Sequence, residues 1–529
     1  MTNPTPTNAT LFSPQDSELL RGVHKNQGAP ASLYINGQWE AARSGEVRTI
    51  INPADGSVVG DVSEASEADT ERAIAAARTA FDAGEWSSTP AVERGRILLK
   101  VAELLREHQE EFARAESADT GKRLEESRID MDDIANAFDY FGTLAQHASG
   151  RVVDPGNTDV RSRIDTEPVG VCGLISPWNY PLLQVSWKVG PCLAAGNTFV
   201  LKQAELTPHT AMMLMTLLER AGVPAGVANL VTGAGATCGN PLSLSPDVDM
   251  VSFTGGLATG KVIARNAAET VKRVALELGG KNPNVIFADA DFDAAVDNAL
   301  NGAFVHSGQV CSAGARLVVE ESIADDFVAA LVERAQKIKI GGPRDEKAET
   351  GPLISAEHLQ KVAGYVDHAR EQGAEILCGG RKATAEDNDG SHGTGATDLS
   401  QGHYFLPTVI AQCTQDMDCV HDEAFGPTVT VETFTTEAEA ISIANDTQYG
   451  LAGAVWTSDA GKAERVVRAL RHGTVWINDF HPYLPQAEWG GMKQSGNGRE
   501  LGPTGLAEYQ EHKHVYHNIA PAVTGWFQG

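Results

Sequence analysis

Short apolar segments alternate with helical stretches from residue 169 onward, and this alternation constrains the fold more than any other feature of the chain. The segments expected to form strands span residues 169–175, 198–202, 228–231, 250–253 and 274–278. Strands that are separated by helices pair in parallel, and the helices then cover both faces of the sheet. A second α/β region is expected from 283 to 479, with helices near 325–338 and 357–372. The pattern therefore predicts an α/β fold.

Capping residues mark several expected helix boundaries. Ser66 and Asp69 resemble a capping box ahead of an Ala-rich stretch that reaches Phe81. A Thr-Pro pair at 207–208 begins another helix, which is expected to end at Gly222.

Length and charge limit the classes of protein to which the chain can belong. With 529 residues it exceeds the size at which one core keeps growing, so more than one domain is expected. The net charge of −28 argues against nucleic acid, whose binding relies on clustered Lys and Arg, and against an anionic membrane surface. A negative field mildly favours a cationic substrate, but solubility is the simpler reason for the charge.

The seven cysteines are dispersed, with no Cys-x-x-Cys pair, so neither a disulfide framework nor a metal site is expected. Residues 1–32 are rich in Thr, Asn and Pro and are expected to form a loosely held arm. We find no signal peptide and no transmembrane helix in the sequence, and a reducing cytoplasm fits these features.

Glu277 and Cys311 lie 34 residues apart, each among glycines and small residues, in the segments LELGGKNP (276–283) and GQVCSAG (308–314). A thiolate attacks a carbonyl carbon, and a carboxylate later activates the water that hydrolyses the thioester. These two residue types are the parts needed to make and then break an acyl-enzyme.

Both motifs resemble those of the aldehyde dehydrogenase superfamily, and the resemblance runs from about residue 33 to about residue 517. Further motifs appear in the order that the family shows. They are PWNYP at 177–181, LKQAE at 201–205, FTGG at 253–256 and EAFGP at 423–427.

The resemblance implies a Rossmann-like NAD-binding domain, an α/β catalytic domain and a small β oligomerisation domain. The flexible arm would span 1–32, the NAD-binding domain 33–150 and 168–282, the catalytic domain 283–494, and the oligomerisation segments 151–167 and 495–529. Relatives use such segments to extend sheets between subunits, so a homodimer or homotetramer is implied.

Three catalytic residues are implied by the resemblance. Cys311 would be the nucleophile, activated by a helix N-terminus after Val310. Asn179 would stabilise the oxyanion together with the Cys311 backbone N–H, and Glu277 would be the base for deacylation. Without the resemblance, the same residues could be an inert buried thiol, a turn residue and a structural acceptor.

The implied cofactor is NAD. Lys202 and Glu205 match the pair that holds the adenosine ribose, and a carboxylate there disfavours the 2′-phosphate of NADP. The chain departs from the family at Gln203, where Pro is frequent, and at Gly256, where Ser is frequent. The other implied cofactor residues are Ser176, Trp178, Gly235, Gly239, Gly255, Gly256, Glu423 and Phe425.

Aromatic residues near the catalytic motifs resemble the box that holds a cationic group in betaine aldehyde and aminoaldehyde dehydrogenases. Val305 stands where plant relatives carry a further Trp, and the segment 478–483 is similar to that of bacterial glycine betaine aldehyde dehydrogenases. The expected reaction is oxidation of betaine aldehyde to glycine betaine, an osmoprotectant. The expected substrate residues are Tyr180, Trp187, His481, Tyr483 and Trp489.

Other functions remain open at this point. The substrate could be an aminoaldehyde or another semialdehyde. The chain could also be a non-catalytic structural relative, or a hydrolase that uses the same thiol, and NAD-dependent turnover separates these classes.

Overall fold

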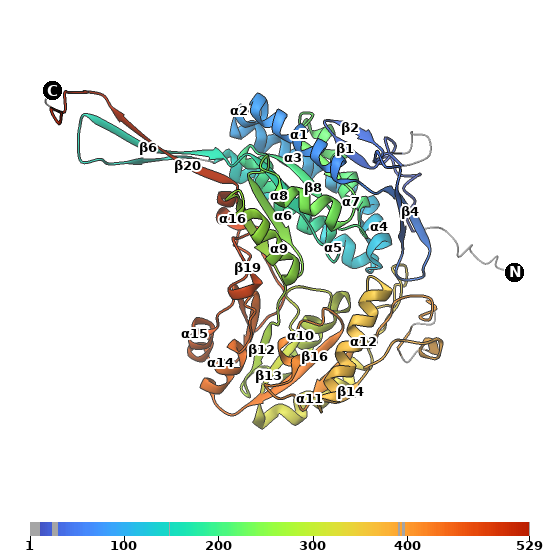
Figure 1. Cartoon of the computed structure of the whole chain (residues 1–529). Coiled ribbons are helices and arrows are strands. Elements are labelled where there is room, and N and C mark those ends of the chain that lie inside the picture. The colour runs from blue at the N-terminus through green and yellow to red at the C-terminus, as the bar shows by residue number, and fades with distance from the viewer. Residues whose placement is uncertain (1–10, 24–29, 148, 390–391, 394–396, 528–529) are drawn as a thin grey trace.

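The computed structural model describes residues 11–23, 30–147, 149–389, 392–393 and 397–527. Figure 1 shows two α/β bodies, one above the other, and a long β-ribbon that projects from the upper body. The expected α/β class is confirmed.

The upper body is built on a sheet of eight strands within the described residues, in the order β19-β11-β10-β7-β8-β9-β1-β2. The central strands from β11 to β9 are parallel. The edge strand β19 pairs antiparallel with β11, and β1 pairs antiparallel with both β9 and the other edge strand, β2. The strands are β1 (Leu33–Ile35), β2 (Gln38–Glu40), β7 (Val171–Ile175), β8 (Thr198–Lys202), β9 (Ala228–Val231), β10 (Met250–Thr254), β11 (Arg273–Glu277) and β19 (Gly496–Asn497).

Helices pack around this sheet because β7 to β11 are buried along almost their whole length and must be covered on both faces. The capping box at Ser66 forms as expected, with the Ser66 hydroxyl accepting from Asp69 N, and Gly222 ends α7 at φ 103°. The helical segments of this body are α1 (Glu67–Ala83), α2 (Glu85–Ser88), α3 (Ala91–Glu107), α4 (Gln109–Thr120), α5 (Leu124–Gln146), α6 (Pro181–Ala195), α7 (His209–Ala221), η1 (Gly235–Gly239), α8 (Asn240–Leu244), α9 (Leu257–Ala268) and α16 (Gly502–Glu508).

The lower body contains a sheet of seven strands within the described residues, in the order β14-β15-β16-β13-β12-β17-β18, parallel except for the edge strand β14. The strands are β12 (Pro283–Ile286), β13 (Arg316–Glu320), β14 (Glu375–Cys378), β15 (Thr408–Ala411), β16 (Thr428–Phe434), β17 (Ala452–Trp456) and β18 (Thr474–Ile477). The helical segments are α10 (Phe292–Phe304), η2 (Val305–Gly308), α11 (Glu321–Ala335), α12 (Ala356–Glu371), η3 (Ala385–Asp389), α13 (Asp418–His421), α14 (Glu437–Asn445), α15 (Ala460–Ala469) and η4 (Lys493–Ser495).

The projecting ribbon is the antiparallel sheet β20-β6-β5, in which β20 pairs with β6 from Gln510↔Pro168 to Asn518↔Val160. Its strands are β5 (Arg151–Val153), β6 (Val160–Pro168) and β20 (Gln510–Asn518). A separate hairpin joins β3 (Val47–Ile51) and β4 (Val58–Ser63).

The expectation of a loosely held arm over 1–32 is wrong for residues 11–23, while residues 1–10 and 24–29 lie outside the described residues. Leu19, Leu20 and Val23 are at most 1% exposed and belong to the main hydrophobic core. The Ser17 hydroxyl also donates to Glu111 at 2.5 Å. The sequence pattern missed this segment because the residues that bury it lie elsewhere in the chain.

Candidate active site

A cleft opens where β7, β10 and β11 of the upper sheet end, facing the lower body. In parallel α/β sheets this edge is where ligands bind. The cleft brings together all three expected catalytic residues and half of the ten expected cofactor residues. Those lining it are Asn179, Glu277, Cys311, Trp178, Gly255, Gly256, Glu423 and Phe425.

Cys311 lies in a turn between η2 and β13, so the expected helix N-terminus after Val310 is wrong. The Asn282 side chain holds this turn, because its Nδ2 donates to the carbonyl oxygens of both Cys311 and Ala313 at 2.9 Å. Burial, with a contribution from Glu277, raises the pKa of the Cys311 thiol to about 12. The resting thiol is therefore protonated, and a base must remove its proton before attack.

Asn179 precedes α6 and is 4% exposed. Its Nδ2 donates to the carbonyl oxygen of Gln309 at 2.9 Å, two residues before Cys311. This bond orients the side-chain amide beside the thiol, where a second amide hydrogen is free to face a substrate oxygen.

Glu277 ends β11 and is 5% exposed. Within the described residues neither carboxylate oxygen has a hydrogen-bond partner. Burial, followed by the nearby negative charge of Glu500, raises the pKa of Glu277 well above its usual value. Glu500 is itself paired with the buried Lys188, whose Nζ also donates to Thr254 Oγ1 at 2.7 Å. A carboxyl in this state gains a proton readily, which suits a general base.

Glu423 approaches the loop after β11 closely. Its Oε1 accepts from Gly280 N at 3.0 Å, and a Cβ at Gly279 would lie 2.1 Å from its Oε2. With the Glu423 carboxylate in this position only glycine fits at 279, which explains part of the Gly-Gly pair in the motif.

The remaining expected cofactor residues lie outside this part of the cleft. Lys202 Nζ is 2.8 Å from Glu205 Oε2, at the end of β8. Gly235 and Gly239 bound the π-helical turn η1, and the Ser176 hydroxyl contacts Gln203.

Gln203 and Gly256 are the two positions at which the chain departs from the family pattern. Gln203 is buried, and its Nε2 donates to Pro177 O at 2.7 Å and to Thr207 Oγ1 at 3.0 Å, so an amide here holds the strand end. A Cβ at Gly256 would meet nothing within 4 Å, and no side chain caps α9 at this residue. The amides of the first turn of α9 are therefore accessible to an anion.

A second cavity also reaches Cys311. It is lined by all five expected substrate residues: Tyr180, Trp187, His481, Tyr483 and Trp489. The Trp187 ring lies 5.2 Å from the ring of Tyr483 and 6.0 Å from that of Trp489, centroid to centroid. Aromatic faces therefore surround much of the approach to the thiol.

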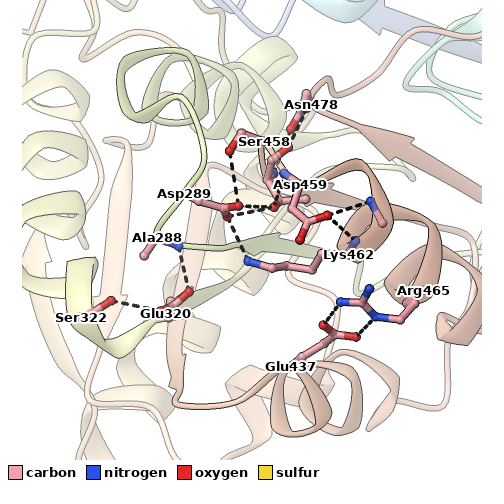
Figure 2. A network of polar contacts seen from close by, with 12 residues as sticks. Ala288, Asp289, Glu320, Ser322, Glu437, Ser458, Asp459, Lys462, Arg465 and Asn478 are labelled. Atoms are coloured by element: carbon pink, nitrogen blue, oxygen red, sulfur yellow. Dashed lines mark hydrogen bonds and ion pairs between the residues drawn. The ribbon is translucent and has the colours of Figure 1, made fainter.

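A polar network anchors the segment that carries His481 and Tyr483. Figure 2 shows Asn478, Ser458, Asp289 and Lys462 within this network. The Asn478 side chain exchanges two hydrogen bonds of 3.0 Å with the backbone of Thr457, whose hydroxyl donates to Asp289. The network holds Asn478 at φ 53°, which turns the chain toward the cavity.

The sequence reasoning missed three acidic residues that line the same cavity: Glu126, Asp130 and Asp133. All three lie on α5, and their spacing of four and then three residues places them on one face of the helix. Asp130 Oδ2 is 2.5 Å from Lys122 Nζ, and burial raises the pKa of Glu126 to about 7. The helical spacing of the acids was the signal that could have revealed them.

Comparison with known proteins agrees with this arrangement. The Aldehyde dehydrogenase family matches residues 39–515. Betaine aldehyde dehydrogenase of Bacillus subtilis is 55% identical over 94% of this chain and 99% of its own length, and peroxisomal aminoaldehyde dehydrogenase 2 of Pisum sativum is 41% identical over 94% and 97%.

Solved structures of related proteins match this chain over nearly its whole length. The betaine aldehyde dehydrogenase of Staphylococcus aureus in complex with NAD+ superposes with a TM-score of 0.92 and is 50% identical, covering 97% of this chain and 99% of the other. The chain belongs to the aldehyde dehydrogenase family, and the expectation from its motifs is confirmed. Among the described residues, no helix has the length and apolar character needed to span a bilayer.

Proposed function

We propose that the chain oxidises betaine aldehyde to glycine betaine with NAD, through a thiohemiacetal and then a thioester on Cys311. The observation that carries the proposal is the second cavity, which combines aromatic rings with the acids of α5 and ends at the thiol. A quaternary ammonium donates no hydrogen bond, so it is held by aromatic faces and by negative charge. Each aromatic face contributes about 0.5–2 kcal/mol.

The carboxylates of α5 attract a cationic substrate over a longer distance than the aromatic rings do. Asp133 and Glu126 lie on the wall of the cavity, and Asp130 is largely neutralised by Lys122. The wall keeps a negative character that favours a cationic aldehyde over a dicarboxylic semialdehyde.

Attack on the aldehyde requires the Cys311 thiolate. Glu277 is the carboxylate with the largest influence on this thiol, and its own raised pKa makes it a capable proton acceptor. As the carbon–sulfur bond forms, the aldehyde oxygen gains negative charge, which Asn179 Nδ2 and the Cys311 backbone N–H would stabilise. One such donor lowers the barrier by about 2.7–4 kcal/mol.

The residues present fit NAD. Lys202 and Glu205 would hold the adenosine ribose, the uncapped first turn of α9 would face the pyrophosphate, and Glu423 and Phe425 would contact the nicotinamide half. The bound cofactor supplies the acceptor for the hydride that leaves the thiohemiacetal carbon. The rings of Trp178 and Phe425 line the cleft that holds Cys311 and would limit the entry of water there.

Glu277 is also the base for deacylation. After Glu277 has released the thiol proton to solvent, its carboxylate removes a proton from the water that attacks the thioester, and the Cys311 sulfur leaves as the thiolate. Asn179 serves again as the donor to the developing oxyanion.

Relatives support the choice of substrate. Solved variants of the Staphylococcus aureus protein carry substitutions in a consecutive His, Pro and Tyr. This tripeptide occurs once in the present chain, at residues 481–483, of which His481 and Tyr483 line the substrate cavity.

We also propose the division into NAD-binding, catalytic and oligomerisation parts expected from the sequence, and a homodimer or homotetramer that is joined through the β20-β6-β5 ribbon. The ribbon projects from the body in Figure 1 and exposes Val152 (87%) and Tyr516 (59%). A cytoplasmic location is supported by seven free cysteines.

The decisive experiment compares NAD reduction by the purified protein with betaine aldehyde, 3-aminopropionaldehyde and succinic semialdehyde. We expect the highest kcat/KM with betaine aldehyde. We expect no NAD reduction by the Cys311→Ser variant with any of the three aldehydes. A clear preference for succinic semialdehyde would overturn the proposed substrate, and a preference for 3-aminopropionaldehyde would assign the chain to aminoaldehydes. Aldehyde-independent ester hydrolysis with no NAD reduction would indicate a hydrolase.

A further inference from the structure

Phe425 has a backbone conformation that a bulky residue seldom adopts. It lines the cleft beside Cys311 with φ at 57°, in the left-handed region. Such a conformation costs free energy and persists only where the surrounding structure holds it. A hydrogen bond to the Phe425 carbonyl oxygen supplies part of this support.

His358 makes that contact. It lies in the first turn of α12, where its backbone N–H donates to the Ser355 hydroxyl at 3.1 Å. Its Nε2 lies 2.6 Å from the carbonyl oxygen of Phe425. A carbonyl oxygen only accepts, so Nε2 carries the hydrogen. Burial lowers the pKa of His358 to about 4, which keeps the imidazole neutral.

The imidazole also joins an aromatic group that spans the two bodies. Its ring lies 5.2 Å from Trp178 and 6.1 Å from Phe425, both edge to face. Trp178 and Phe425 lie 5.3 Å apart at 90°. Trp178 belongs to the upper body and the other two to the lower body, and all three line the same cleft.

We propose that His358 is a positioning residue for the cofactor: by holding Phe425 and packing against Trp178, it sets the shape of the cleft beside Cys311. The inference rests on the proposed NAD site. His358 is no proton carrier in this arrangement, because its hydrogen is committed to a backbone carbonyl and a neutral buried ring with so low an affinity for protons is a poor base.

Three substitutions separate the parts of this role. His358→Ala removes both the donor and the ring, His358→Phe keeps the ring alone, and His358→Gln keeps an N–H donor. His368→Gln is the matched control, since this residue lies on the same helix, is half exposed and, within the described residues, pairs with Asp418 and Glu371.

The measurements are the Kd of NAD, by quenching of tryptophan fluorescence, and the KM values of NAD and aldehyde with kcat. We expect His358→Ala to raise the Kd and KM of NAD about tenfold, with the aldehyde KM changed less than twofold. His358→Gln should restore most of the affinity and His358→Phe should not. The shape of the pH–rate profile should be unchanged in all variants.

Unchanged NAD affinity in folded His358→Ala would overturn the inference while leaving the proposed function intact. If the Ala variant does not fold, equal NAD affinity of the Gln and Phe variants would overturn it instead. Absence of NAD binding by the wild-type protein would overturn the proposed function itself.

Discussion

Tyr483 donates its hydroxyl hydrogen to Asp133 Oδ2 at 2.7 Å, joining the loop after β18 to helix α5 at the substrate cavity. The two residues are 350 positions apart in the sequence. Burial raises the pKa of Asp133, and the bond from Tyr483 opposes that rise. The contact favours the ionised form of Asp133 on the cavity wall and holds the Tyr483 ring in place.

Replacing Asp133 by Asn should weaken the preference for a cationic aldehyde. The suitable pair of substrates is betaine aldehyde and 3,3-dimethylbutanal, which have the same shape but differ in charge. We expect the ratio of their kcat/KM values to fall about tenfold, because the carboxylate charge is lost while the amide still accepts from Tyr483. Tyr483→Phe should reduce kcat/KM for both substrates by a similar factor. An unchanged ratio in Asp133→Asn would exclude Asp133 from charge recognition.

Glu126→Gln should change how stability depends on pH. The folded carboxyl has a pKa of about 7 against its ordinary value of 4.5, so between these values the folded state binds a proton that the unfolded state has lost. Its contribution to stability is present at low pH and is lost as pH rises through 7. We expect the Tm of the variant relative to wild type to rise from pH 5 to pH 8, which corresponds to up to about 3 kcal/mol in the free energy of unfolding.

Glu125→Gln is the control for this measurement, because Glu125 directly precedes Glu126 on α5 and its side chain is 62% exposed. It should leave the pH dependence of Tm as in wild type. A parallel shift in both variants would mean that the effect comes from net charge rather than from burial of Glu126.

Glu277→Gln should slow both the activation of Cys311 and deacylation. An amide takes no proton from water, so steady-state turnover should fall about 10²–10⁴-fold. In wild type, kcat should rise with pH into the neutral or alkaline range, because the pKa of Glu277 is raised and only the ionised carboxylate is a base. The assay is NAD reduction from pH 5.5 to 9.5, with quenched-flow trapping of the acyl-enzyme; wild-type turnover by the variant would contradict the role.

The buried ion pair Arg316–Glu432 should dominate the stability of the lower sheet. Arg316 on β13 is fully buried, Glu432 on β16 is 3% exposed, and the pair is bidentate. Arg316→Met leaves the carboxylate buried without its partner, which typically costs about 3–5 kcal/mol. The measurement is the free energy of unfolding in urea.

An exposed pair provides the comparison. Arg465 and Glu437, seen at the right of Figure 2, form a similar bidentate bridge with side chains 58% and 31% exposed. Arg465→Met should cost less than about 1 kcal/mol. Equal losses in the two variants would show that burial does not determine the strength of these pairs.

Local pattern was sufficient for much of the architecture. β8 and β9 form over the residues that their apolar runs predict, and the capping box at Ser66 and the glycine at 222 bound their helices. The cluster of Cys311, Glu277 and Asn179 was anticipated from motifs, and the structure brings these residues to one cleft. The packing of residues 11–23 was not anticipated, since what buries them lies elsewhere in the chain.

Periodicity, caps and motif spacing are properties of neighbouring residues, so the amino-acid order alone determined the alternation of strands and helices and the identity of the reacting groups. The tertiary structure decided which distant groups meet and how much water they lose. It joined Tyr483 to Asp133 and placed Cys311 in a buried turn instead of at a helix end. Desolvation depends on every segment that covers a group, and for that reason the direction of the Cys311 and Glu277 pKa shifts emerged only from the folded chain.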